Sequence, residues 1–122
     1  MVLVDTSIWI DHLRSGNAKL TALLNDGEAA VHPFIIGELA CGNLKNRKEI
    51  ISLLHALPHI DKADDDEVLF FIEKRKLMGL GTGLIDCHLL ASCKLGNSTI
   101  LTKDKRLRDA ADRLELLSTC KP

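Results

Sequence analysis

Short apolar runs alternate along this chain with longer segments in which apolar residues recur at every third or fourth position. The run VLVD at 2–5 is typical of a buried parallel strand, and EAAVH at 28–32 and NSTILT at 97–102 have the same character. HID at 59–61 and LELL at 114–117 are weaker candidates for strands. Helices are expected over 7–13, 17–25, 33–42, 45–57, 64–79, 84–96 and 103–113.

Capping and turn residues separate these segments. Ser7 is a candidate N-cap, Pro33 suits the first position of a helix, and Gly27 and Gly96 suit helix ends. Strands that alternate with helices imply βαβ units, a mostly parallel sheet, and helices on both of its faces. No repeat or linker divides the sequence, so we interpret residues 1–122 as one domain.

The composition is that of a globular protein, with 46% hydrophobic and 27% charged residues. The 16 Lys and Arg against 17 Asp and Glu give a net charge of −1. This balance neither indicates nor excludes a nucleic-acid ligand, because a local basic rim would be lost in the sum. No signal-peptide pattern is present, and no apolar run approaches the roughly 20 residues of a membrane span. We therefore expect a cytoplasmic protein that does not bind membranes.

The four cysteines form no C-x-x-C pair and are interpreted as free thiols of a reducing compartment. They are Cys41, Cys87, Cys93 and Cys120. A zinc site made of Cys87, His88 and Cys93 is an alternative, but its spacing fits no common ligand pattern. The five histidines show no ligand spacing, and Trp9 is expected in the core or, alternatively, in a dimer interface.

Four of the acidic residues lie in apolar surroundings, whereas most of the others lie in charged stretches such as DKADDDE. Asp5 ends the first strand, and Asp104 follows a late strand. Glu38 in PFIIGELACG and Asp86 in GLIDCHLLAS have no other charged residue nearby in the sequence. Burying an unpaired carboxylate costs several kcal/mol, so each position requires an explanation.

Each of these acids also has a purely structural explanation. Asp5 and Asp104 could cap the helices that follow them, Asp86 could interact with its helix dipole, and Glu38 could be partly exposed. The carboxyl ends of parallel strands, however, meet at one edge of a sheet, where ligands bind. The four acids could therefore converge there, and their mutual repulsion would raise some of their pKa values.

A divalent cation would relieve this repulsion. Mg²⁺ and Mn²⁺ prefer oxygen ligands, and such ions promote phosphodiester hydrolysis by polarising the phosphoryl group and activating water. Thr6, Ser7 and Thr102 place hydroxyl groups beside two of the acids, either for water and carboxylate positioning or for ordinary capping and strand formation.

Two other phosphate chemistries are less consistent with the sequence. GLGTG at 79–83 lacks the order of a phosphate-binding loop and follows a helix, so we interpret it as a connector. A receiver-type signalling module also gathers acids around Mg²⁺, but it requires an acidic pair at the first strand end and an acceptor Asp that ends a middle strand. Here Asp5 is followed by hydroxyls, and Glu38 and Asp86 fall in expected helices.

The segments LVDTSIWI, IIGELACG, GLIDCHLLA and ILTKDKRL, in this order, resemble the PIN-domain family and, within it, the VapC-type toxins. The resemblance covers essentially the whole chain. It implies a Mg²⁺- or Mn²⁺-dependent endoribonuclease with a three-layer αβα sandwich and a mostly parallel sheet of four to five strands. The acidic residues of the family fall on Asp5, Glu38, Asp86 and Asp104, and its hydroxyls fall on Thr6 or Ser7 and on Thr102.

The resemblance further implies a homodimer, an RNA substrate and a cognate antitoxin whose tail blocks the acidic site. A catalytically silent PIN-like binding domain is the alternative, against which the presence of all four acids argues. Some relatives carry another acid after the last motif, where this chain has Lys105 and Arg106. Candidates for RNA contacts are Arg47, Lys48, Lys74, Arg75, Lys76, Lys103, Lys105 and Arg106.

Overall fold

The computed structural model describes residues 1–118, which form three short strands and seven helices. In chain order these are β1 (Val2–Val4), α1 (Thr6–Ser15), α2 (Ala18–Asn25), β2 (Ala29–Ala30), α3 (Pro33–Ala40), α4 (Arg47–Ala56), α5 (Asp65–Arg75), α6 (Leu84–Leu95), β3 (Thr99–Leu101) and α7 (Lys105–Arg113). Every helix expected from the sequence is present.

The sheet is parallel, with β1 between β2 and β3. Leu3 lies opposite Ala30 on one side and Ile100 on the other. Single bridges extend both edges, from Val31 to His59 and from Ile100 to Leu117. The expectation of four to five strands is corrected to three within the described residues. The segment 59–61 contributes one bridge because Ile60 alone of its residues is buried.

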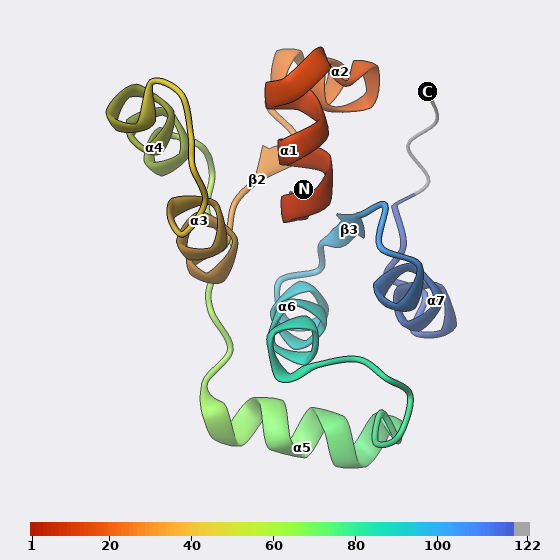
Figure 1. Cartoon of the computed structure of the whole chain (residues 1–122). Coiled ribbons are helices and arrows are strands. Elements are labelled where there is room, and N and C mark those ends of the chain that lie inside the picture. The colour runs from red at the N-terminus through yellow and green to blue at the C-terminus, as the bar shows by residue number, and fades with distance from the viewer. Residues whose placement is uncertain (119–122) are drawn as a thin grey trace.

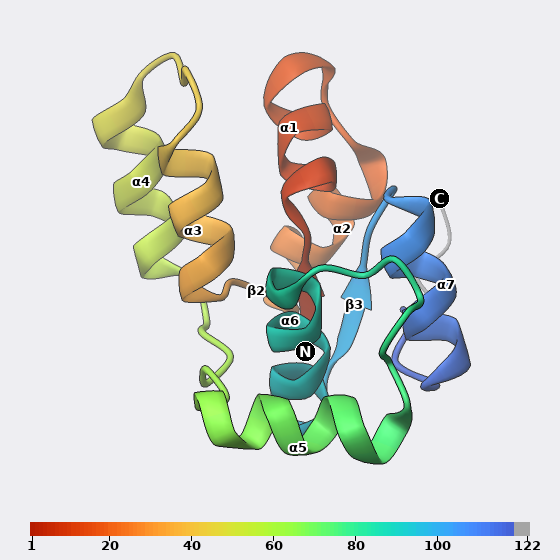
Figure 2. The same cartoon turned by 60° about the horizontal axis from the view of Figure 1, so that its bottom comes forward.

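Helices cover both faces of the sheet, which confirms the layered α/β fold expected from the sequence. Figure 1 shows α1 and α2 on one side of the strands and α6 on the other, with α5 outside α6. Figure 2, from another angle, shows α3 and α4 beside β2 and α7 beside β3. Because α6 lies between the sheet and α5, it is buried nearly all round; Leu89 and Leu90 have no exposed surface.

The beginnings of the helices explain much of this order. Pro33 is at the first position of α3, as expected, and Asn17 caps α2 through its side chain. The N-cap expected at Ser7 is wrong: Asp5 occupies the cap position of α1, although its side chain makes no capping hydrogen bond. Trp9 is 5% exposed, which confirms the prediction that it lies in the core.

The cysteines have separate environments in the structure. Cys41 is exposed, Cys87 and Cys93 are buried, and all three are free thiols; Cys120 lies outside the described residues. Cys87 Sγ is 3.9 Å from Thr82 Oγ1, whereas Cys93 Sγ is 3.9 Å from the carbonyl oxygen of Thr99. Within residues 1–118, each helix is too short or too polar to cross a membrane.

Candidate active site

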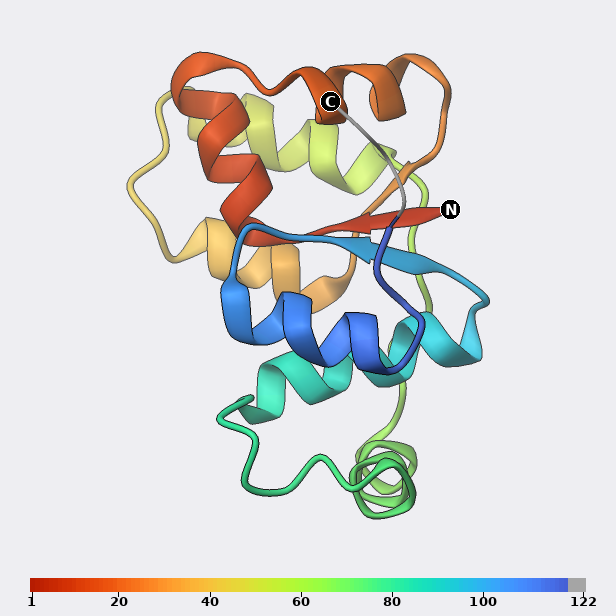
Figure 3. The same cartoon turned by 90° about the vertical axis from the view of Figure 1, so that its right-hand side faces the viewer.

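The four isolated acids come from elements that begin or end at the same edge of the molecule. Figure 3 shows the carboxyl ends of β1 and β3 on its left side, together with the beginnings of α1, α6 and α7. Asp5 follows β1, Asp104 follows β3, and Asp86 lies in the first turn of α6. Glu38 lies on α3, which packs against α1. The convergence expected from strand order is therefore present in the backbone.

Asp5 is the most buried of the four, with 7% of its surface exposed. Thr102 Oγ1 donates a hydrogen bond of 2.7 Å to Asp5 Oδ2, and Ser7 Oγ donates one of 2.9 Å to the same oxygen. These two hydroxyl donors compensate for the water that the carboxylate loses on burial. They also fix the orientation of Asp5, whose carboxylate makes no capping hydrogen bond to α1.

A chain of backbone contacts joins this pair of hydroxyls to the beginning of α7. The N–H of Lys103 donates to Ser7 Oγ at 3.0 Å, and the N–H of Asp104 donates to Thr102 Oγ1 at 3.0 Å. Asp104 Oδ1 in turn accepts from the N–H of Leu107 at 3.0 Å, so Asp104 caps α7. The structural explanation for Asp104 is thus correct, and the same cap holds this carboxylate at the acidic edge.

Glu38 is joined to the site by Thr6, the hydroxyl residue that directly follows Asp5. Thr6 Oγ1 donates to Glu38 Oε1 at 3.1 Å. Partial desolvation raises the pKa of Glu38, the hydrogen bond from Thr6 opposes this rise, and the negative charge of Asp5 adds to it. Glu38 is otherwise an exposed helix residue, as the structural explanation expected.

The pKa of Asp86 reflects the convergence of all four acids. Burial is the largest cause of its raised pKa, and the negative charges of Asp104 and Asp5 raise it further; Glu38 adds a smaller effect. A backbone hydrogen bond from Gly83 at the beginning of α6 acts in the opposite direction. Asp86 therefore lies in the combined field of the other three carboxylates, which adds to the effect of burial on its pKa.

The donor set at this edge fits a hard divalent cation. It consists of carboxylate and hydroxyl oxygens, and a cation would relieve the repulsion between the carboxylates. Within residues 1–118, no group of three or more His, Cys, Asp and Glu side chains is arranged so that it could hold a metal ion by itself. In this arrangement an ion would be held by one or two carboxylates together with water, which is the usual mode of Mg²⁺ binding.

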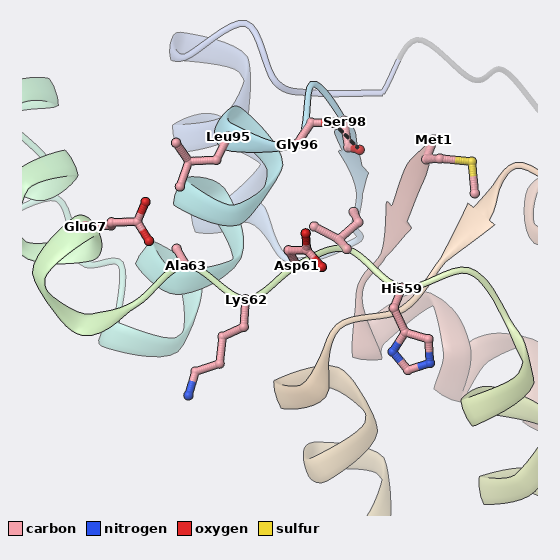
Figure 4. Close-up of a pocket in the computed structure, with 10 residues that line it drawn as sticks. Met1, His59, Asp61, Lys62, Ala63, Glu67, Leu95, Gly96 and Ser98 are labelled. Carbon is pink, nitrogen blue, oxygen red and sulfur yellow. Dashed lines mark hydrogen bonds between the residues drawn. The ribbon is translucent and has the colours of Figure 1, made fainter.

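Other hollows of the surface differ from this edge in chemistry. One of about 410 Å³ lies at the amino ends of β1 and β3, where Met1 and Ser98 contribute to its lining. Figure 4 shows Ser98 bonded to the backbone of Gly96, and Lys62 extending away from Glu67 and Asp61. This hollow lies at the edge of the sheet opposite to the four acids and has no comparable carboxylate cluster.

A polar groove of about 430 Å³ adjoins the acidic edge, and Thr102 and Lys103 are among its lining residues. Lys19 and Arg108 also line it, although the list of candidate RNA contacts omitted both. Arg108 was detectable, because it follows Asp104 by four residues and so shares its face of α7. Arg47, which the sequence made a candidate for RNA contact, instead donates hydrogen bonds to the carbonyl groups of Ala40 and Gly42 at the end of α3.

Comparison with known proteins adds to this geometry. Residues 2–113 match the model of the PIN domain. The chain is 46% identical over 111 residues to ribonuclease VapC32 of Mycobacterium tuberculosis, a match that covers 90% of each chain. A toxin–antitoxin complex from Klebsiella pneumoniae has a similar fold, with a TM-score of 0.64 at 21% identity over 85% of this chain and 87% of that one. FitAcB from Neisseria gonorrhoeae has a TM-score of 0.64 at 20% identity, over 92% and 94%.

Proposed function

The chain belongs to the PIN-domain family, and from this membership and the acidic site we propose that it is a metal-dependent endoribonuclease, the toxin of a toxin–antitoxin pair. One observation carries the proposal. Asp5, a nearly buried carboxylate, is held by two hydroxyl donors at the edge where Glu38, Asp86 and Asp104 converge. The similarity of the chain to ribonuclease VapC32, over 90% of its length, supports the same activity.

We assign Asp5, Asp86, Asp104 and Glu38 to binding of Mg²⁺ or Mn²⁺. When bound, such an ion polarises a phosphodiester and lowers the pKa of a bound water so that it becomes a nucleophile. Asp5 has its orientation fixed by Ser7 and Thr102, and this fixed geometry lowers the reorganisation needed when substrate binds. Glu38 and Asp86, whose pKa values are raised, are the carboxyls most suited to accept a proton at the site.

The hydroxyl groups orient the acids. Thr6 holds Glu38, whereas Ser7 and Thr102 hold Asp5 and contact each other at 3.3 Å. Because Thr102 Oγ1 accepts from the N–H of Asp104 while it donates to Asp5, it fixes the relative position of two of the acids. We therefore expect Thr102 to act on the reaction through these acids.

An antitoxin that occupies the acidic site is the regulatory partner in this proposal. A groove of about 620 Å³ begins at Glu38 and runs between α1 and the segment after α3. Ile10 and Leu13 line it and are 43% and 39% exposed, which is a large exposure for apolar residues on adjacent turns. A partner segment with apolar side chains would cover both residues and would block Glu38.

We further propose that residues 1–122 act as one PIN-like domain, that the chain forms a homodimer, and that it acts in the cytoplasm. The match over residues 2–113 supports the first point. The exposed Leu69, Phe70 and Leu95 on α5 and α6 offer an apolar surface for self-association. Sedimentation of the purified chain tests the dimer: a single species of monomer mass at micromolar concentration would contradict it.

The activity is tested on protein purified free of partners, incubated with structured RNA and Mg²⁺ or Mn²⁺. We expect cleavage that EDTA abolishes and that Asp5→Asn and Asp86→Asn reduce by at least about 100-fold, with folding checked by circular dichroism. Absence of cleavage would support a silent binding domain. Cleavage that persists unchanged with EDTA or in both folded variants would overturn the proposal.

A receiver-type module is the second candidate, and the structure disfavours it. Glu38 and Asp86 lie in α3 and α6, as the sequence predicted, and Asp5 is followed by Thr6 rather than by a second acid. The second strand in chain order, β2, is followed by Val31 and His32 and so does not end at an acceptor aspartate. Incubation with acetyl phosphate separates the two functions. A stable acyl phosphate on an aspartate, without cleavage of RNA, would support the receiver instead.

A further inference from the structure

The groove of about 430 Å³ beside the acidic edge differs in charge from the rest of the molecule. Three cationic residues line it, Lys19, Lys103 and Arg108, against one carboxylate, Asp11. The chain as a whole carries a net charge of −1, so the groove is more positive than the molecule as a whole. Its size lies within the range of about 300–1000 Å³ that is typical of ligand pockets.

The one carboxylate of the groove is already neutralised. Asp11 Oδ1 is 3.4 Å from Lys103 Nζ, and Asp11 Oδ2 accepts a hydrogen bond of 2.8 Å from Asn17 Nδ2. Asn17 and Lys103 together hold the pKa of Asp11 below its usual value, so Asp11 remains ionised and pairs with Lys103. The positive potential of the groove is therefore set mainly by Lys19 and Arg108.

Lys19 and Arg108 have no polar partner within residues 1–118, unlike some other arginines of the surface. Among the ion pairs and side-chain hydrogen bonds between these residues, none involves either of them. By contrast, Arg106 donates to the carbonyl oxygen of Gly81, and Arg113 donates to that of Arg75. Two cations that form no ion pair or side-chain hydrogen bond in this part of the chain are available to an anionic ligand.

The groove is continuous with the acidic site. Thr102, which donates to Asp5, lines the groove, and the backbone N–H of Lys103 donates to Ser7 Oγ. A strand whose scissile phosphodiester lies at Asp5 would therefore have its neighbouring phosphates at this groove. The lining of the groove also includes the partly buried Leu117, against which a base can pack.

We propose that this groove, bounded by α1, α2, β3 and α7, binds the phosphodiester backbone of single-stranded RNA next to the cleavage site, with Lys19 and Arg108 as its phosphate contacts. This inference rests on the proposed nuclease function. It assigns to both residues a role in substrate binding rather than in the chemical step. Asp11 moderates the affinity by neutralising Lys103.

The test measures RNA binding and cleavage separately. Binding of a fluorescent single-stranded RNA is followed by anisotropy in EDTA, so that no cleavage occurs, for wild type, Lys19→Ala, Arg108→Ala and Lys94→Ala. Lys94 is an exposed matched control at the opposite end of α6 from Asp86. We expect each groove variant to bind about three- to tenfold more weakly, with a salt slope lower by about 0.7, and Lys94→Ala to bind as wild type.

Conservative and opposite changes exclude simple misfolding. Lys19→Arg and Arg108→Lys keep the positive charge and are expected to bind RNA as the wild type does. Asp11→Asn is expected to tighten binding by about threefold, because the charge that neutralises Lys103 is removed while the amide contact from Asn17 is kept. With metal present, Lys19→Ala and Arg108→Ala should raise KM and leave kcat unchanged. Equal losses in Lys94→Ala, or unchanged affinity of both groove variants, would overturn the proposal.

Other ligands are distinguished by parallel measurements. Equal binding of DNA of the same sequence, with the same losses in the groove variants, supports recognition of the phosphodiester backbone. Tighter binding of a polyglutamate peptide than of RNA would overturn the proposal in favour of an acidic protein segment. Wild-type chain that binds RNA but does not cleave it would refute the nuclease function alone, whereas cleavage unaffected by the groove variants would refute the groove alone.

Discussion

Thr102 and Asp5, separated by 97 residues in the sequence, are joined by a buried hydrogen bond of 2.7 Å from Thr102 Oγ1 to Asp5 Oδ2. The bond exists because β1 and β3 are parallel neighbours, so their carboxyl ends lie side by side. The same hydroxyl accepts from the N–H of Asp104. The Thr102 side chain thus joins the first of the four acids of the site, Asp5, to the last, Asp104.

Removing this hydroxyl should affect both activity and stability. We expect Thr102→Val, which is close to isosteric, to lower kcat by about tenfold or more, because Asp5 loses its strongest orienting contact and Asp104 loses an acceptor. Stability should fall by about 2 kcal/mol, the usual cost of a buried hydrogen bond to a charged group. Single-turnover cleavage and urea unfolding measure the two effects. Thr99→Val, on the same strand, is the control, and an equal loss of activity there would contradict the role of Thr102.

The Asp86 carboxylate is expected to lower the stability of the metal-free protein while it supports cleavage. Its pKa is raised by burial and by Asp104 and Asp5, so its ionised form is unfavourable in the folded protein at neutral pH. Without metal, Asp86→Asn should raise Tm by about 2–5 °C at pH 7, because it removes this charge and keeps an acceptor for Gly83. Cleavage should be lost.

The comparison is made by thermal unfolding in EDTA and again with Mg²⁺. Added Mg²⁺ should raise Tm of the wild type more than that of Asp86→Asn, because ligand binding stabilises the state that binds it. Asp66→Asn provides a control, since Asp66 is an exposed acid in the first turn of α5. A lower Tm of Asp86→Asn in EDTA would show that the acids do not repel one another.

The sequence was sufficient for the helices and for the edge at which the acids meet. Strand ends and helix beginnings are local features: VLVD ends at an acid, and Pro33 and Gly96 mark boundaries that the structure confirms. Since parallel strands bring their carboxyl ends together, the convergence of Asp5 and Asp104 follows from order alone. The assignment of the four acids as metal ligands remains a prediction.

What the sequence could not specify depends on long-range geometry. Nothing local distinguishes Ser7 as an N-cap from Ser7 as a donor to Asp5, because the choice depends on Thr102, which comes from β3. The number of strands was overestimated for a related reason. A short segment such as 59–61 forms a strand or a single bridge according to how its neighbours are buried. Lys19 was missed because only the fold brings this residue of α2 to the same groove as Arg108 of α7.

Metal-dependent cleavage should rise from acidic to neutral pH. Carboxylates must be ionised to bind a cation. Because the pKa values of Glu38 and Asp86 are raised, protons compete with the metal at pH values above those at which carboxyl groups usually titrate. Thr6→Val should shift the acidic limb of the kcat/KM profile further upward, because the hydrogen bond from Thr6 lowers the pKa of Glu38. Thr21→Val, an exposed threonine on α2, is the control. An activity maximum near pH 4 would contradict this account.

A buried histidine away from the acidic edge should control stability at low pH. His32 has no exposed surface, and its Nδ1 accepts from the N–H of Phe34, so Nε2 carries the proton and donates to Ser92 Oγ at 3.1 Å. Burial, and to a smaller extent the charges of His88 and Lys62, lower the pKa of His32 to about 4. His32 is therefore neutral in the folded protein at neutral pH.

The unfolded chain binds this proton more readily, because its histidine has the ordinary pKa of 6.5. Stability due to neutral His32 is complete above pH 6.5 and is lost as pH falls toward 4, by about 3 kcal/mol in total. His32→Asn retains an acceptor for the cap of α3 but does not titrate in this range. The difference between wild type and His32→Asn in urea unfolding, measured from pH 7 to pH 4, isolates the effect from that of the acids. A constant difference would show that His32 does not titrate as described.

The hydroxyl partner of His32 should matter for stability and not for catalysis. Ser92 Oγ also accepts from the N–H of Ala63, so Ser92→Ala would leave two buried donors without a partner. We expect a loss of about 2–3 kcal/mol in the free energy of unfolding, with unchanged kcat at a temperature where the variant is folded. Ser52→Ala, on the exposed face of α4, should change neither quantity. The cost of two unpaired donors acts on folding alone. A lower kcat of Ser92→Ala while the protein stayed folded would therefore contradict the prediction and would show that the hydrogen bonds around His32 are coupled to the acidic site.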